Sequence, residues 1–237
     1  MDRKIILTGD GSHSISVPEL NVPYHSIYGA VQESMHVFIN AGFYQAIKST
    51  PARQIKILEV GFGTGLNALL TLVEAEKIKT KVYYEAIELY PLNNEEIRTL
   101  NYCRHLNRPE LQPIFEELHS CKWEKEIPIT KYLALLKRND NLLNLAGRRT
   151  GPEFPEPMKL FELIYFDAFA PNAQPELWTK EVFDRMYAML EPGGILVTYC
   201  SKGDVRRAMI AAGFEVEKLP GPPRKREMLR AAHPIVI

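Results

Sequence analysis

The segment ILEVGFGTGLNALL, residues 57–70, constrains the fold more than any other part of the chain. Three glycines, Gly61, Gly63 and Gly65, separate an apolar run that predicts a buried strand from one that predicts a helix. Because glycine permits positive φ and lets the backbone approach a ligand closely, this unit is typical of nucleotide-binding and nucleoside-binding α/β domains. The loop alone leaves open a dinucleotide, a nucleoside-sulfonium cofactor or a simple tight turn.

Predicted strands and helices alternate along the chain, starting with the strand that precedes the glycine loop. The predicted strands are residues 55–60, 82–88, 131–136, 161–166, 195–199, 214–219 and 227–232, and the clearest helices are residues 66–78, 180–190 and 204–212. Such alternation predicts an α/β fold with a mainly parallel, Rossmann-like, seven-stranded sheet that has helices on both faces. We assign residues 51–237 to this domain, with a loop at residues 146–160 where Gly and Pro are frequent.

We predict that residues 1–50 form a small N-terminal extension. Two short β-prone runs flank Asp10-Gly11, a strong turn signal, so the chain should open with a hairpin. A helical pattern follows from Ser26 to about Ile47, and Gly42 is expected to break it. The extension also holds His25, Glu33 and His36, which lack a third ligand at metal spacing and are interpreted as structural.

Charge and cysteine content exclude several classes of protein. Lys plus Arg and Asp plus Glu both number 29, so no global field indicates a nucleic acid or a membrane as partner, and a polyanion could bind only at a local patch. No apolar run approaches the roughly 18 residues of a membrane span. The three cysteines are widely spaced and match neither a zinc site nor a disulfide framework. We therefore expect a cytoplasmic protein without a metal.

Acidic residues at the predicted strand ends are the candidate cofactor ligands, since ligands bind beyond the carboxyl ends of parallel strands. Glu88 lies 23 residues after Gly65, where a carboxylate can accept hydrogen bonds from both ribose hydroxyls; a salt-bridged surface glutamate is the alternative. Glu59 precedes the loop, which lacks the third glycine of the dinucleotide pattern. An acid there repels a pyrophosphate but suits the cationic end of S-adenosylmethionine.

Asp140 is a further candidate cofactor ligand. It follows the third predicted strand together with Asn139, where an acid or an amide can bind the adenine amino group. The sequence KRND is equally typical of a plain polar turn, so the residues leave both interpretations open.

Asp167 is the candidate catalytic residue. It ends the apolar strand FELIYF and begins the loop DAFAPNAQPELW, so a carboxylate is delivered into a loop that contains Phe169, Pro171 and Trp178. The aromatic rings could stack on a base, and the loop would then form a wall of the active site. The alternatives are an aspartate that braces the loop and aromatic side chains that fill the core.

A basic loop lies between the last two predicted strands. From Ser201 to the end the chain has eight basic and four acidic residues, and Arg224, Lys225 and Arg226 are consecutive. A solvated charged loop is the default interpretation. Contacts with the phosphates of a nucleic acid are also consistent with the pattern.

Together these motifs resemble a known family. The segments YHSIYGAVQESMHVF, LEVGFGTGLN, YFDAFAPNAQPELW, LEPGGILVTYCSKGDVRRAMIAAGFEV and RKREML resemble the methyltransferase part of the MnmC family of tRNA-modifying proteins and, more closely, its stand-alone MnmD branch. The resemblance extends from about Lys4 to Arg230. It implies a class I S-adenosylmethionine-dependent fold and methyl transfer to the primary amine of an aminomethyl uridine, often 2-thiolated, at the wobble position of the tRNA anticodon stem-loop.

By matched position, the resemblance implies that the three loop glycines and Glu88 bind the cofactor and that Asp167 faces the amine. The family's flavin oxidase part has no counterpart in this sequence, which implies that another enzyme supplies the aminomethyl group. Two departures are visible: Ala168 stands where the bifunctional proteins usually have glycine, and GPPRKRE replaces a glycine-aromatic-glycine lead-in.

Three other functions compete with this one. A methyltransferase for a small molecule, or an aminopropyltransferase, would need the same glycine loop and strand-end acids. Only the basic loop distinguishes a tRNA methyltransferase from these two enzymes. A nicotinamide oxidoreductase is disfavoured by Glu59 and by the missing third glycine. A tRNA-binding module without catalysis would have no use for acids that face a cofactor loop.

Overall fold

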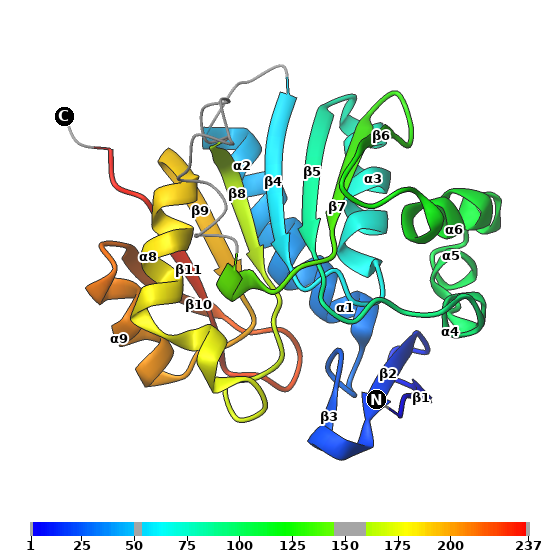
Figure 1. Ribbon diagram of the computed structural model, residues 1–237, viewed down its shortest axis with the longest axis horizontal. Helices are drawn as coiled ribbons and strands as arrows, with labels where there is room; N and C mark the ends of the chain where they lie inside the picture. Colours follow the sequence, from blue (N-terminus) through cyan, green and yellow to red (C-terminus); the bar gives the residue numbers. More distant parts are fainter. Residues whose placement is uncertain (1, 50–53, 145–159, 236–237) are drawn as a thin grey trace.

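The computed structural model describes residues 2–49, 54–144 and 160–235. Its centre is an eight-stranded sheet with the strand order β10-β11-β9-β8-β4-β5-β7-β6 (Figure 1). The strands are β4 (Gln54–Val60), β5 (Lys81–Ile87), β6 (Glu126–Pro128), β7 (Leu133–Arg138), β8 (Phe161–Phe166), β9 (Leu190–Thr198), β10 (Glu215–Pro220) and β11 (Glu227–Ala232).

The strand directions confirm the predicted fold class. Strands β7, β5, β4, β8 and β9 are parallel to one another, whereas β11 is antiparallel to β9 and β10 is antiparallel to β11. All seven predicted strands are present. The prediction missed β6, an edge strand of three residues that pairs antiparallel with β7 and is too short to show a hydrophobic period.

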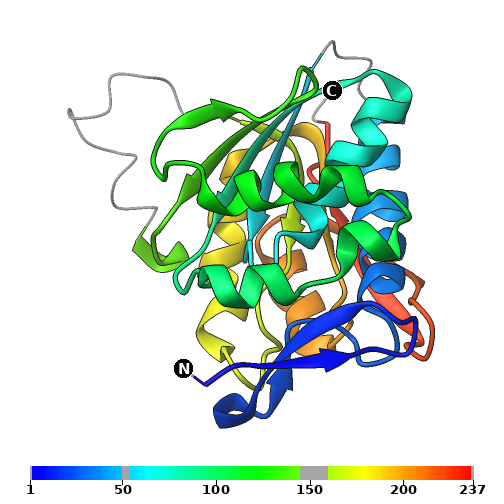
Figure 2. The same ribbon diagram turned by 90° about the vertical axis from the view of Figure 1, so that its right-hand side faces the viewer.

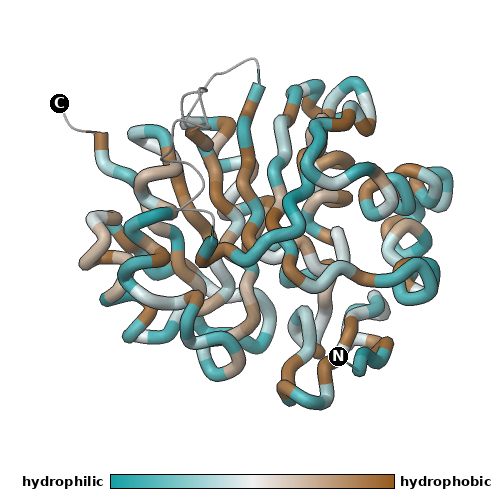
Figure 3. The backbone as a smooth tube through the Cα atoms, viewed as in Figure 1, coloured by the Kyte–Doolittle hydropathy of each residue, from teal (hydrophilic) through white to brown (hydrophobic). Residues whose placement is uncertain are grey.

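Two hydrophobic cores lie on opposite faces of the sheet, because successive side chains of a strand point to opposite sides. On β4, Ile57 belongs to one core and Leu58 to the other. Figure 3 shows the hydrophobic residues concentrated along the central strands. The helices are α1 (Ala30–Ser34), α2 (Tyr44–Ser49), α3 (Leu66–Ile78), α4 (Asn94–Thr99), α5 (Tyr102–His105), α6 (Gln112–Ser120), α8 (Lys180–Met189) and α9 (Gly203–Ala211).

The helical part of the N-terminal extension does not break at Gly42, so that prediction is wrong. A π-helical segment, Met35–Phe43, runs between α1 and α2 and includes this glycine. A Cβ atom at Gly42 would lie 3.0 Å from a methyl carbon of Val197 and 3.1 Å from the ring of Tyr165. The glycine therefore allows the helical segment to lie close to β8 and β9, which is a packing role that the sequence pattern does not reveal.

The predicted N-terminal hairpin is confirmed as β1 (Lys4–Leu7) and β2 (His13–Val17), and a short β3 (Val22–Pro23) completes a three-stranded sheet. Figures 1 and 2 show this sheet at one end of the molecule, beside α4 and α5. Asn101, just before α5, accepts a hydrogen bond from the His13 amide at 2.7 Å and donates one to the Gly11 carbonyl at 2.9 Å. The extension is thus attached to the main domain by specific contacts.

The chain order fixes where a ligand should bind. From β4 the sheet grows on one side through β5 and β7 and on the other side through β8 and β9, so its topological switch point lies between β4 and β8. The predicted loop at residues 146–160 falls almost wholly outside the described residues. Within the described ranges, no helix is long and apolar enough to cross a membrane.

Candidate active site

A cavity of about 180 Å³ opens at the switch point, beyond the carboxyl ends of β4, β5, β7 and β8. Strand-end residues Gly61, Glu88, Asp140 and Asp167 line it together with Tyr24, His25 and Phe169. The sequence-based expectation that strand-end acids meet at one site therefore agrees with the structure. Among the described residues that line the cavity, none is lysine or arginine.

The glycine loop adopts the backbone conformation that the sequence predicts. Gly61, Gly63 and Gly65 have φ values of +88°, +51° and +70°, which side chains rarely permit. A Cβ atom at Gly61 would lie 2.7 Å from the carbonyl oxygen of Asp167. Glycine at this position therefore lets the loops after β4 and β8 touch, and the cavity is enclosed by their contact.

Glu88 connects the glycine loop to the loop after β5. Its carboxylate accepts hydrogen bonds from the Gly63 amide at 2.8 Å and from the Tyr90 amide at 2.7 Å. Asn139, at the end of β7, donates to the Glu88 carbonyl at 2.9 Å. The carboxylate is thus held at the cavity wall by backbone donors, in the place from which a strand-end acid can reach a ribose.

Asp140 lines the cavity next to Asn141 and Leu142. It is 9% exposed, and its carboxylate accepts a hydrogen bond from the Asn141 amide at 2.8 Å. The structure therefore places this carboxylate in the cavity wall, one strand away from Glu88 in the sheet.

Glu59 lies below the cavity and does not line it. It is fully buried, and one carboxylate oxygen accepts a hydrogen bond of 2.9 Å from the Asn67 amide nitrogen. The same nitrogen donates at 2.9 Å to an oxygen of Asp167. Asn67 therefore joins the two carboxyl groups with both of its amide protons.

The surroundings of Asp167 suit a proton acceptor. Burial, followed by the Glu33 carboxylate, raises the pKa of Asp167 to about 8, although the Asn67 hydrogen bond and the Lys225 charge act in the opposite direction. Burial and the Asp167 charge also raise the pKa of Glu59 well above its usual range. Asp167 is the carboxyl group of this pair that faces the cavity, so a proton could pass between it and a ligand near neutral pH.

The aromatic residues predicted from the loop after β8 occupy different places. Phe169 lines the cavity, and its ring packs edge-on against Tyr24 with 4.9 Å between the centroids. Trp178 does not line the cavity; it is 6% exposed and packs on Phe166 in the core. Its indole N–H donates to the Phe169 carbonyl at 2.8 Å, so Trp178 holds the loop in place. Pro171 lies in the loop and outside the cavity wall.

The three basic residues of the last loop also differ from one another. Arg224 and Arg226 are exposed, and the Arg224 guanidinium lies 5.5 Å above the ring of Tyr28. Lys225 instead turns inward and forms an ion pair with Glu33 of α1. The loop therefore lies near the same end of the sheet as the cavity.

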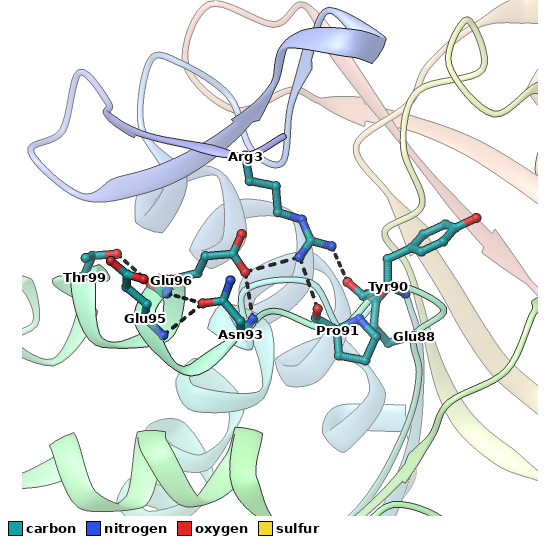
Figure 4. A network of polar contacts seen from close by, with 8 residues as sticks. All are labelled: Arg3, Glu88, Tyr90, Pro91, Asn93, Glu95, Glu96 and Thr99. Carbon is teal, nitrogen blue, oxygen red and sulfur yellow. Dashed lines mark hydrogen bonds and ion pairs between the residues drawn. The ribbon is translucent and has the colours of Figure 1, made fainter. Parts of the chain in front are cut away.

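The N-terminal extension holds the cavity wall that follows β5 (Figure 4). The Arg3 side chain, 9% exposed, donates to the carbonyls of Tyr90 and Pro91 and pairs with Glu96 of α4 at 3.3 Å. Asn93 caps α4 by accepting bonds from the amides of its first turn. Tyr90 lines the cavity, whereas Arg3 does not. Arg3 therefore holds the backbone of the cavity wall in place from outside the cavity.

We expect Arg3→Ala to weaken cofactor binding by roughly tenfold, because two backbone carbonyls and a carboxylate lose a charged donor and the wall loosens. The turnover number should change less than twofold, since Arg3 forms no hydrogen bond or ion pair with Asp167 or Asn67. Calorimetric titration with the cofactor and steady-state rates at saturation would measure both. Arg98→Ala, which removes an exposed arginine of α4, is the control and should affect neither.

Sequence reasoning missed Asn67, Arg3 and the lining residues Tyr24 and His25. Asn67 is the one polar residue in the apolar run LNALL. A polar amide within an otherwise apolar helix is the feature from which a role at the site could have been predicted. His25 is buried, and burial lowers its pKa to about 4, so the ring is neutral and shares a hydrogen bond with the Ser14 hydroxyl. No sequence period marks Arg3. The three cysteines are free, as predicted.

The cavity's chemistry selects among cofactors. Its charged side chains are acidic, namely Glu88, Asp140, Asp167 and Glu176, and no described lining residue carries a positive charge. A pyrophosphate would be repelled there, which argues against a dinucleotide. A sulfonium cation with ribose hydroxyls and an adenine matches the acceptors, so the residues fit S-adenosylmethionine. Within the described part of the chain, no cluster of residues could hold a metal ion.

Comparison with known proteins agrees with this chemistry. The MnmC protein of Aromatoleum aromaticum, named a tRNA 5-methylaminomethyl-2-thiouridine biosynthesis bifunctional protein, is 33% identical over 214 residues, which are 89% of this chain and 32% of that protein. The MnmC protein of Idiomarina loihiensis is 32% identical over 218 residues, 87% of this chain and 34% of that protein. The chain thus spans about a third of the length of these relatives.

The crystal structure of MnmC2 from Aquifex aeolicus has the same fold, with a TM-score of 0.74 and 24% sequence identity over 100% of this chain and 72% of that one. The profile of a family described as S-adenosyl-L-methionine-dependent methyltransferases matches residues 110–234, which is just over half of the chain. The matched region includes Asp140 and Asp167. The chain belongs to this family of S-adenosyl-L-methionine-dependent methyltransferases.

Proposed function

We propose that this chain methylates the exocyclic primary amine of an aminomethyl uridine, often 2-thiolated, at the wobble position of tRNA. The observation that carries the proposal is Asp167, a cavity carboxyl with a pKa of about 8 that Asn67 holds in place. An amine must lose a proton to be methylated, and this site has a group suited to accept it. The named role of the MnmC relatives supplies the class of amine.

The cofactor supplies an electrophilic methyl group when it is bound. The protein's part is to orient the amine and to manage its proton. A primary ammonium has a pKa near 10.4, so the free amine is scarce at neutral pH. With one Asp167 oxygen fixed by Asn67, the other oxygen can accept the ammonium proton, and the neutral amine then has a free lone pair.

Phe169 and Tyr24 flank the Asp167 end of the cavity, and we assign them to the flat faces of the substrate base. The exposed Arg224 and Arg226 are assigned to phosphates of the anticodon stem-loop. Glu88 and Asp140, with the glycine loop, are assigned to the cofactor's ribose and adenine. The aminomethyl group itself would be made by a separate reaction before methylation.

The test is to incubate the protein with S-adenosylmethionine and tRNA that carries unmethylated aminomethyl uridine, and to analyse the nucleosides by mass spectrometry. We expect the aminomethyl uridine to gain one methyl group and other nucleosides to remain unchanged. Transfer RNA with unmodified wobble uridine is the matched control and should accept nothing. If neither tRNA is methylated while small primary amines are, the chain is a small-molecule methyltransferase and the proposal fails.

The raised pKa of Asp167 predicts how cofactor binding depends on pH. A sulfonium cation beside the carboxyl group favours its charged form, so binding should release a proton wherever Asp167 is protonated in the free protein. The association constant for S-adenosylmethionine should therefore rise between about pH 6 and about pH 8, by up to about tenfold per pH unit. S-adenosylhomocysteine lacks the sulfonium charge and should show a flatter profile in calorimetry.

The Asp167→Asn variant is the control, because it cannot release this proton. The two ligands should then show the same dependence on pH. A wild-type protein in which both ligands give parallel profiles would contradict the assignment of the sulfonium to the neighbourhood of Asp167.

A further inference from the structure

Lys225 occupies a partly buried cation site, whereas its neighbours Arg224 and Arg226 are exposed. Its ammonium forms an ion pair with Glu33 and lies 4.5 Å above the ring of Tyr199. The Glu33 side chain is 7% exposed, whereas that of Lys225 is 32% exposed. A lysine from the loop between β10 and β11 thus reaches inward to α1, 192 residues away in the sequence.

The site that holds this ammonium is fixed by the surrounding protein. The second carboxylate oxygen of Glu33 accepts a hydrogen bond from the Ser26 amide at 2.7 Å. The Tyr199 hydroxyl donates to the Ala168 carbonyl at 2.9 Å, which sets the position of the ring. A carboxylate and an aromatic face together are a general solution for binding an alkylammonium ion. Neither group depends on Lys225 for its position.

The site adjoins the candidate catalytic residue. Glu33 raises the pKa of Asp167 and Lys225 lowers it, so both charges act on that carboxyl group. Both also act on His25, which lines the cavity. Tyr199 is tied to Ala168, the residue after Asp167. The ammonium of Lys225 therefore lies beside the end of the cavity where the substrate's amine would react.

We propose that Glu33 and Tyr199 form a binding site for the substrate's primary ammonium group, that Lys225 fills this site in the free protein, and that the substrate displaces it. The proposal rests on the proposed function. Exchange of one alkylammonium for another leaves the charge around Glu33 and Asp167 unchanged, so no buried carboxylate is left without a cation. The released Lys225 joins Arg224 and Arg226, where a phosphate can neutralise it.

The proposal predicts that removing Lys225 exposes an ammonium receptor. We expect Lys225→Met to bind benzylammonium, measured by calorimetry in the presence of S-adenosylhomocysteine, at least tenfold more tightly than the wild-type protein, because no internal cation competes. The double variant Glu33→Gln/Lys225→Met should lose this binding. Benzyl alcohol has the same ring without the charge and should bind none of the proteins.

Lys218→Met is the matched control, since Lys218 belongs to the adjoining β10 and pairs with Glu227 at the surface. It should bind benzylammonium as weakly as the wild-type protein. Lys225→Gln, whose amide can still donate to Glu33, replaces Lys225→Met if that variant does not fold. Equal affinity in the wild-type protein and the Lys225 variants, or binding that survives the loss of Glu33, would overturn the proposal. Because the assay needs no methyl transfer, its result is independent of whether tRNA is the substrate.

Discussion

Asp167→Asn is expected to lower the turnover number by about 10²-fold to 10⁴-fold, the usual contribution of a positioned proton acceptor. The asparagine keeps the shape of the side chain but cannot take the proton of the ammonium. Cofactor affinity should change less than threefold at about pH 6, where Asp167 is protonated in the free wild-type protein, and should fall at a pH above about 8, where the variant lacks the carboxylate charge that favours the sulfonium. Single-turnover methylation and calorimetric titration would separate the two quantities.

The control for this prediction is Asp184→Asn. Asp184 is a half-exposed aspartate of α8 that pairs with Lys180 and does not line the cavity, so its loss should leave turnover unchanged. A turnover number for Asp167→Asn within threefold of the wild-type value would remove the carboxylate from the reaction and leave it only a structural role.

Gly61→Ala is expected to weaken S-adenosylmethionine binding by more than tenfold and to lower the free energy of unfolding by about 1–3 kcal/mol, the cost of a strained backbone conformation for a residue with a side chain. The φ value of +88° disfavours alanine, and the added Cβ would lie 2.7 Å from the Asp167 carbonyl oxygen. The loops after β4 and β8 would have to separate, which opens the cavity. Urea denaturation and cofactor titration would measure these effects.

Gly203→Ala is the matched control. Gly203 begins α9, and an added Cβ would meet only the mobile end of the Arg207 side chain at 3.2 Å. We expect no loss of cofactor affinity and a change in stability of less than about 0.5 kcal/mol, as for most surface substitutions. If Gly61→Ala behaved in the same way, the contact between the two loops would not be what shapes the cavity.

The fold was predictable because its signals are local and periodic. Apolar runs such as residues 161–166 mark buried parallel strands, and glycines between a strand and a helix mark the ligand loop. The same logic placed Glu88, Asp140 and Asp167 at one edge of the sheet, and all three line the cavity. The predicted helix break at Gly42 was wrong because the sequence does not distinguish a glycine that permits close packing from one that ends a helix.

Contacts between distant side chains had no comparable signal. Glu59 precedes the glycine loop, and the sequence predicts that it binds the cofactor. Successive side chains of β4 point to opposite faces of the sheet, and the Glu59 side chain points toward Asn67 and does not line the cavity. Arg3 reaches the wall after β5, and Lys225 pairs inward instead of facing a phosphate. Each of these contacts depends on tertiary packing, which no single segment encodes.

The strand order has a consequence for the synthesis of the chain. Strand β11 is made after β10 but lies between it and β9, so this sheet closes with the last of its own strands to be synthesised. The central strands that carry Gly61, Glu88 and Asp167 can pair earlier, as N-terminal parts generally fold first. Docking of β11 brings the adjoining loop, with Lys225, against Glu33. A nascent chain therefore cannot complete the end of the sheet that carries the cavity until residues 225–232 have left the ribosome.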